Sequence, residues 1–320
     1  DGAVRMLSIA SVLVGLCVLV AGGCGGQSGR AGTSRRAVSV ATRPVVRTDT
    51  VAAVPPRPAP PRLSVSVPAF FAGEWRPAAH LGATVAAWLA QRGGVTLMRF
   101  DQSVTRLALH AGASEPGGSG WRYGDEIGPS EVHRVIAGFN GGFKLTYASQ
   151  GFLSYGRVAA PLRGGLASIV TYRDGTTQIG SWNEGVPSGA PIASVRQNLH
   201  LLIDHGRPAA TVESCGASCW GETLGGGSAV ARSALGIDAD NRLVWGAGES
   251  LTPAELASAM VAAGVQRAVE LDINPFWVAG YMYEHSEAGP RAVPIVPGQH
   301  GIEGELLGPD NRDFFAVSAR

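Results

Sequence analysis

The sequence predicts an α+β fold, a mixed β-sheet domain with several hairpins and few helices. Short apolar runs with strand-like alternation recur along the chain, and turn residues separate them. A single stretch carries a full set of helix signals, with Thr252 in the N-cap position, Pro253 at N1, Glu255 at N3 and Gly264 after the last turn. This helix lies inside the one strand–helix–strand crossover that the pattern indicates, over residues 242–272.

Turn residues set the expected order of the strands. Asp101-Gln102, Asp174-Gly175 and Ala239-Asp240-Asn241 each lie between two alternating runs, which is typical of a β-hairpin. Ser130 can cap a short helix over 130–135. The expected strands are 95–100 paired with 103–110, 135–139, 166–172 paired with 176–182, 195–204, 231–237 paired with 242–246, 265–272 and 314–317.

Residues 1–24 have the pattern of an export signal. The apolar run from Met6 to Val20 is shorter than the roughly 20 residues that a membrane-spanning helix needs, and small residues follow it. Residues 21–24, Ala-Gly-Gly-Cys, resemble a bacterial lipobox, with Ala21 in place of the usual leucine. We expect an exported lipoprotein that is anchored to the membrane through a lipid on Cys24. Cleavage by an ordinary signal peptidase is the alternative.

Residues 25–67 predict a disordered Arg/Pro-rich tether. They contain seven Arg and one acidic residue, Asp49, and they become proline-rich from Pro55 onward. Few aromatic or long apolar side chains are present to form a core. The basic charge could contact anionic lipid or an acidic wall polymer, or the segment could be a solvated spacer.

We expect residues 68–320 to form one domain. The formal net charge of the whole chain is +1, which argues against a nucleic-acid-binding protein. Outside the signal and the lipobox, the remaining cysteines are Cys215 and Cys219, and this spacing in an exported protein predicts a short-loop disulfide. A metal site would need more Cys or His nearby, so we predict neither a metal nor a cofactor.

Two carboxylates on an expected strand give the strongest indication of a functional site. Glu270, Asp272 and Asn274 share one face of the segment that begins at residue 265, while Leu271 and Ile273 lie on the other face. A crossover strand of this kind is normally apolar throughout. Buried carboxylates are costly unless they are paired or used, and ligands bind at the carboxyl ends of such strands.

Three further groups of polar residues lie at expected strand positions. Arg232 opens an alternating strand and could present its guanidinium to a phosphate or a carboxylate, or it could be a solvated edge residue. Asn140, Gly141 and Gly142 follow an apolar strand and would let the backbone approach a ligand, although an ordinary turn also fits. Arg196, Asn198 and His200 share a face, and His200 could be an acid–base group or a structural histidine.

Taken together, these segments resemble the phosphodiester glycosidase family over residues 130–275. The matching segments are Asn140-Gly141-Gly142-Phe143, then the strand 232–237, then the helix pattern 251–257, and finally Leu271-Asp272. Their order and spacing both fit the family. The sequence departs from the family pattern after Asp272, where Ile-Asn-Pro-Phe-Trp stands in place of Gly-Gly-Gly-Ser.

The resemblance implies a phosphodiester glycosidase-like fold over residues 68–320 and a hydrolase that cleaves a sugar from an anomeric phosphodiester. It implies catalytic roles for Arg232, which would hold the phosphate, and for Asp272 and Glu270, which would stabilise the oxocarbenium ion or direct water. The implied substrate-binding residues are Asn140, Gly141, Gly142, Arg196, Asn198, His200, Asn274 and Trp277. For an exported lipoprotein, the expected partner is a phosphate-linked carbohydrate of a wall polymer or exopolysaccharide.

Two alternatives stay open. A non-catalytic glycan-binding envelope lipoprotein would keep the fold and would use Phe276 and Trp277 to stack against sugars. A metal-dependent esterase could use Glu270, Asp272 and Asp238, but the sequence offers no clear set of His ligands for it.

Overall fold

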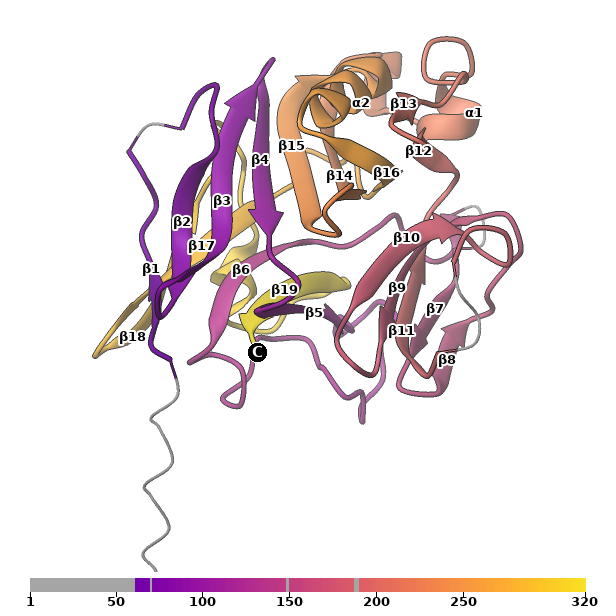
Figure 1. The fold of residues 1–320 in the computed structure, drawn as a ribbon. Coiled ribbons are helices and arrows are strands. Elements are labelled where there is room, and N and C mark those ends of the chain that lie inside the picture. The colour runs from indigo at the N-terminus through magenta and orange to yellow at the C-terminus, as the bar shows by residue number, and fades with distance from the viewer. Residues whose placement is uncertain (1–60, 70, 148–149, 187–189) are drawn as a thin grey trace, which may run out of the picture. The chain divides into compact units, whose positions relative to one another are not determined.

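Three β-sheets form the part of the chain that the structure describes, residues 61–320 without 70, 148–149 and 187–189 (Figure 1). The structure is a computed structural model, and the described residues belong to one compact unit. The predicted export signal, Cys24 and most of the predicted tether lie outside the described residues. Within the described part, no helix has the length and apolar character that a membrane span requires.

The large sheet has nine strands, and its paired neighbours are antiparallel. Its order is β1 (Leu63–Val65), β2 (Arg76–Leu81), β3 (Thr84–Arg92), β4 (Val95–Phe100), β15 (Leu243–Leu251), β14 (Val230–Asp238), β16 (Val265–Glu270), β12 (Leu201–Asp204) and β13 (Arg207–Pro208). Strand β1 lies inside the segment predicted as tether, so the sheet begins before residue 68. Three strand residues next to a proline-rich run are too few for alternation to reveal them.

The second and third sheets have five strands each, and these are also antiparallel. The second sheet has the order β10 (Thr177–Ser181), β9 (Ala167–Tyr172), β11 (Ile192–Gln197), β7 (Phe152–Ser154) and β8 (Arg157–Ala160). The third has the order β18 (Gly289–Pro294), β17 (Gly280–Ser286), β6 (Val135–Asn140), β19 (Phe314–Ala319) and β5 (Thr105–His110).

Helices are few in the described residues, as the sequence predicted. They are α1 (Ala217–Trp220), α2 (Pro253–Ala262) and two short 3-10 segments, η2 (Leu224–Gly226) and η3 (Glu303–Leu306). Helix α2 begins with the predicted capping box, in which Thr252 accepts a hydrogen bond from the Glu255 backbone and the Glu255 side chain bonds back. Its buried residues Leu256, Ala257 and Met260 pack in one cluster with residues of the large sheet, such as Leu97 and Val244. In Figure 1, α2 lies beside β14, β15 and β16.

Aromatic residues join the large sheet to the third sheet. The Phe139 ring of β6 lies 5.4 Å from the Trp245 ring of β15 and 5.8 Å from the Phe315 ring of β19, measured between centroids. All three side chains are buried in one apolar cluster. Each such burial is worth about 1.5–3 kcal/mol relative to exposure, so this cluster holds β6 and its C-terminal end firmly in place.

The two hairpins 166–182 and 231–246 are confirmed, since β9 pairs with β10 and β14 with β15. The predicted hairpin 95–110 is wrong, because β4 and β5 lie in different sheets. A turn near Asp101 redirects the chain, and β5 pairs instead with the distant strand β19. Distant pairings of this kind leave no local pattern in the sequence.

Two other predictions are also corrected. Residues 130–134 form turns rather than a helix, because β6 begins at Val135 and leaves room for only one turn after Gly128. The expected strand 195–204 is divided into β11 and β12. The break lies at residues 198–200, where Leu199 has a φ of 44° and the Asn198 side chain bonds to neighbouring segments.

Candidate functional site

Hydrogen bonds bring together Asn140 at the end of β6, Ser233 within β14 and Asp272 just beyond the end of β16. The Ser233 amide donates to the Asp272 carbonyl at 3.0 Å, and the Leu271 amide donates to the Ser233 carbonyl at 2.8 Å, so residues 271–272 continue the pairing of β16 with β14. From the neighbouring sheet, Asn140 Nδ2 donates to Ser233 Oγ at 2.8 Å. These bonds place the end of β6 beside the residues that follow β16.

Backbone amides and Arg312 hold the Asp272 carboxylate in place. Its Oδ1 accepts hydrogen bonds from the amides of Ile273 at 2.7 Å and Asn274 at 2.9 Å. Its Oδ2 lies 2.8 Å from Arg312 Nη2, which also donates to the Gly142 carbonyl at 2.7 Å. Within the described residues, Oδ2 is in an ion pair but receives no aligned hydrogen bond.

Burial raises the pKa of Asp272 above its ordinary value, while Arg312 and the two backbone amides act in the opposite direction. Desolvation dominates because the side chain is almost fully buried. A carboxylate in such an environment, beside a cation and at the wall of a cavity, is typical of functional sites, although structural ion pairs also perturb pKa values.

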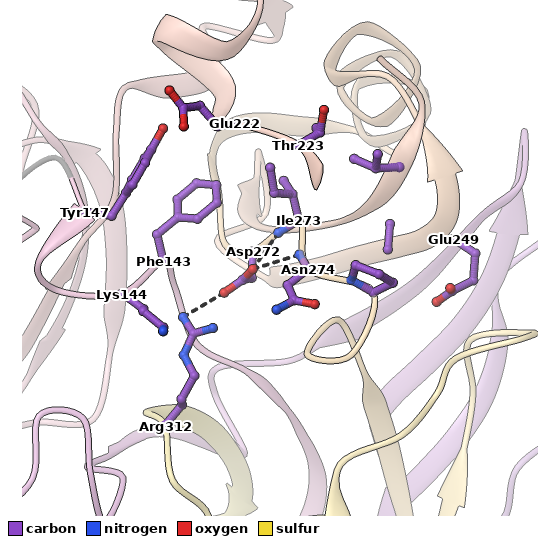
Figure 2. A pocket seen from close by; sticks show the side chains of 13 residues that line it. Phe143, Lys144, Tyr147, Glu222, Thr223, Glu249, Asp272, Ile273, Asn274 and Arg312 are labelled. Atoms are coloured by element: carbon purple, nitrogen blue, oxygen red, sulfur yellow. Dashed lines mark hydrogen bonds and ion pairs between the residues drawn. The ribbon is translucent and has the colours of Figure 1, made fainter. Parts of the chain in front are cut away.

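A cavity of about 600 Å³ opens in front of Asp272 (Figure 2). Figure 2 shows Asp272 directed toward Arg312, with Lys144 on the same side of the cavity and Glu222 and Glu249 farther away. The lining residues are Phe143, Lys144, Tyr147, Glu222, Thr223, Val230, Ala231, Glu249, Asp272, Ile273, Asn274, Pro275 and Arg312. Lys144 and Arg312 therefore lie at one end of the cavity, beside the Asp272 carboxylate.

Arg232 and Glu270 form a buried ion pair behind this cavity, with 2.7 Å between Nη1 and Oε1. Arg232 also donates to the carbonyls of Leu251 at 2.8 Å, Trp220 at 3.2 Å and Ser228 at 3.3 Å. Burial raises the pKa of Glu270 to about 7, while Arg232 opposes that change. Arg232 lines a separate hollow of about 650 Å³ near α1, and neither residue lines the cavity in front of Asp272.

A second buried ion pair lies against the glycine segment, residues Gly141 and Gly142, and holds it in place. Arg196 bonds to Asp313 through Nε at 2.8 Å and Nη2 at 3.0 Å, and both side chains are fully buried. A Cβ at Gly141 would collide with Asp313, and one at Gly142 would lie 2.9 Å from Asn198 Oδ1. Glycine is required here because these neighbours approach the backbone closely.

The Asn198 side chain links the glycine segment to the backbone just before Asp272. Its Oδ1 accepts from the Phe143 amide at 3.0 Å, and its Nδ2 donates to the carbonyls of Leu271 at 2.8 Å and of Glu270. The predicted residues Asn140, Gly141, Gly142, Arg196 and Asn198 thus form the frame that supports the cavity.

The remaining predicted residues are dispersed. Asn274 lines the cavity, but His200 is exposed and does not line it. Trp277 lines an adjoining hollow, with Arg312 5.0 Å above its ring, whereas Phe276 is 62% exposed and its ring lies 4.6 Å from that of His300. Trp277 and Phe276 therefore face different neighbours.

Asp238 lies at the far end of β14 from the cavity. It pairs in register with Val265, and its Oδ1 accepts from the amides of Asp240 and Arg242. Among the described residues, no group of three or more His, Cys, Asp or Glu side chains is placed to hold a metal ion. Asp238 therefore does not combine with Asp272 in one ligand set.

Cys215 and Cys219 are disulfide-bonded, as the sequence predicted, with their Cα atoms 5.6 Å apart. The bond flanks α1, whose last residue, Trp220, is buried and accepts from Arg232 through its carbonyl. The disulfide thus lies near the Arg232–Glu270 pair and away from Asp272.

Sequence reasoning missed both cations of the cavity. Arg312 stands in the segment Asp310-Asn311-Arg312-Asp313, immediately before β19. Charged residues directly before a buried strand are a signal that could have indicated a site. Lys144 directly follows the Asn-Gly-Gly-Phe segment and is the only lysine in the sequence.

No protein-family model matches the chain, and no curated protein matches it. Among solved structures, the zebrafish N-acetylglucosamine-1-phosphodiester alpha-N-acetylglucosaminidase catalytic domain, auto-inhibited by its pro-peptide, is similar with a TM-score of 0.44 and 13% identity, over 82% of this chain and 89% of that one. A hypothetical protein from Synechocystis gives a TM-score of 0.39 at 14% identity, over 74% of this chain and 63% of that one. A putative exported protein from Burkholderia pseudomallei gives 0.27 at 10% identity, over 74% and 75%. At these TM-scores the similarities carry no argument about function.

Proposed function

We propose that this chain is a hydrolase that cleaves a sugar from an anomeric phosphodiester. The observation that carries the proposal is one arrangement: the buried Asp272 carboxylate, ion-paired with Arg312 through Oδ2, lies at the wall of a cavity of about 600 Å³ that Arg312 and Lys144 also line. A phosphodiester places one negative charge next to a sugar ring. The cations match the charge, and the rest of the cavity accommodates the ring.

In the reaction, the bond between C1 of the sugar and the ester oxygen breaks, and the phosphate monoester leaves with the electron pair. Water then supplies a hydroxyl group to C1 and releases a proton. A phosphate monoester is a weakly basic leaving group, so it needs less acid assistance than an ordinary alcohol. Arg312 and Lys144 stabilise the charge that grows on the phosphate. Asp272 stabilises the oxocarbenium ion or accepts the proton of the attacking water.

Arg232 and Glu270 have positioning roles in this proposal. The guanidinium of Arg232 already donates to Glu270 and to three carbonyl groups. It holds β14 and β16 in register, and Asp272 extends from the end of β16. Arg312 takes the phosphate-binding role that the sequence had suggested for Arg232.

The test is release of sugar from a panel of glycosyl phosphodiesters. Asp272→Asn keeps the shape of the side chain but removes its charge, so it should lower kcat by a factor on the order of 10²–10⁴ with a smaller effect on KM. Arg312→Leu should raise KM and lower kcat together, while Arg291→Leu, at an exposed position on β18, should change neither. Binding without release across the panel would leave the glycan-binding alternative standing.

The pH dependence provides a second readout. Because the pKa of Asp272 is raised, activity that needs its ionised form is lost as the pH falls through that raised value. The acidic limb of kcat/KM should therefore lie above the range of an ordinary aspartate, roughly pH 3.9. A limb at or below that range would contradict the assigned role.

Export and anchoring complete the proposal. The pattern of residues 1–24 and the Cys215–Cys219 disulfide, a bond typical of oxidising compartments, support a protein that acts outside the cytoplasm on phosphate-linked sugars of a wall polymer or exopolysaccharide. Metabolic labelling with a fatty-acid analogue should mark the wild type and not Cys24→Ala. Retained label in the variant would contradict the lipid anchor.

A further inference from the structure

A second hollow of about 610 Å³ lies on the other side of the two cations. Lys144 and Arg312 line both this hollow and the cavity in front of Asp272. The wall of the second hollow also includes the polar residues Ser114, Glu115, Thr146 and Asn311, and Trp277 supplies an aromatic surface.

Two N–H groups in this wall have no acceptor among the described residues. The Nε1 atom of Trp277 and the Nε atom of Arg312 are buried and make no hydrogen bond. Glu115 Oε2 lies 3.8 Å from Arg312 Nε, which is too long for a hydrogen bond. Buried donors in folded proteins are almost always satisfied. Two residues that line this hollow, Trp277 and Arg312, therefore each carry a donor that no described residue satisfies.

We propose that this hollow binds the alcohol half of the phosphodiester, a hydroxyl-rich sugar or polyol that leaves with the phosphate; this inference rests on the proposed function. A phosphate held by Lys144 and Arg312 has two ester oxygens. With the cleaved sugar in front of Asp272, the second ester oxygen is directed into the second hollow.

The chemistry of the wall selects this class of alcohol. Ser114 Oγ donates to Asn311 Oδ1 at 3.0 Å, which leaves the Asn311 amide N–H groups for a ligand hydroxyl. Thr146 adds a hydroxyl group, and the Trp277 ring can cover the apolar face of a sugar or polyol carbon chain. An alcohol with no hydroxyl group besides the esterified one, such as methanol, uses none of these contacts.

The experiment compares two esters of the same sugar 1-phosphate, one with glycerol and one with methanol. Wild type should show a kcat/KM at least tenfold higher for the glycerol ester. Ala159→Phe fills the hollow from an exposed position on β8 that does not line the Asp272 cavity. It should lower the glycerol ester to the rate of the methyl ester and leave the methyl ester unchanged. Val158→Phe, at the adjacent exposed position, is the matched control.

Equal rates for the two esters in wild type, or an equal effect of Ala159→Phe on both, would overturn the inference. Failure of the proposed function gives a different result, which is no release from either ester. In that case, protection of Lys144 from an amine-reactive reagent, read on its own peptide, reports binding, since it is the only lysine in the sequence. Stronger protection by the glycerol ester, lost in Ala159→Phe, supports the subsite, and equal protection by both esters refutes it.

Discussion

Replacement of Glu270 by glutamine should remove a large part of the pH dependence of the protein's stability. Glu270 is fully buried, and desolvation raises its pKa from 4.5 to about 7 despite the attached Arg232. Between these two pH values the folded protein keeps a proton that the unfolded chain has released. The free energy of unfolding therefore falls as the pH rises through this window.

The magnitude follows from the pKa change. At about 1.4 kcal/mol for each pKa unit, a rise from 4.5 to about 7 corresponds to about 3 kcal/mol of stability lost between the two pH values. Glu270→Gln cannot ionise, and its side-chain oxygen can still accept from Arg232. The variant should match the wild type within about 1 kcal/mol at pH 5. Relative to the wild type, it should gain about 3 kcal/mol by pH 8.5.

The assay is urea denaturation of both proteins at intervals from pH 5 to pH 8.5, with the disulfide intact. Groups common to the two proteins cancel in the difference between their unfolding free energies. Glu287→Gln, at an exposed position in the turn between β17 and β18, is the control and should run parallel to the wild type. Parallel curves for wild type and Glu270→Gln would refute the reasoning.

Three other predictions concern the frame of the site and the elements around it. Gly141→Ala should destabilise the protein by about 3 kcal/mol in denaturant titration, because the new Cβ would collide with the buried, ion-paired carboxylate of Asp313. Gly124→Ala, at a position with open space, is the control and should be nearly neutral. Equal effects of the two substitutions would contradict the prediction. Replacing Cys215 and Cys219 together by serine should lower the unfolding free energy by about 2 kcal/mol, as the short loop implies, and thiol titration of the unfolded, unreduced domain should find neither sulfur free. Thr252→Ala should cost about 1 kcal/mol by loss of the cap, and an unchanged midpoint would count against the capping box.

Local signals in the sequence predicted local structure. The capping residues Thr252 and Glu255 specified α2, and the turns at Asp174 and Asn241 specified their hairpins. Pairing between distant segments could not be predicted this way. The partner of β5 is β19, and no residue between 95 and 110 indicates it.

The candidate site was predictable in part, because one of its residues gives a local signal in the sequence. Asp272 stood out because a carboxylate on an otherwise apolar strand is unusual, and the structure places it at the wall of a cavity. The surroundings of Arg232 could not be inferred, because its alternation on a strand does not reveal that three carbonyls and Glu270 surround it. Arg312 enters the site through an irregular segment, where the sequence has no periodic pattern that could have predicted it.

The central place of β19 in the third sheet has a consequence for how this protein folds. Strands β5 and β6 both pair with β19 and not with each other. Each must therefore wait for residues 314–319 to be synthesised and to reach it. Until then β6 can pair only with β17, and β5 has no partner strand. Contacts of such high sequence separation slow folding and expose strand edges to aggregation. Arg312 and Asp313 immediately precede β19. The ion pairs of Arg312 with Asp272 and of Asp313 with Arg196 therefore form in the same late folding step as the pairing of β19.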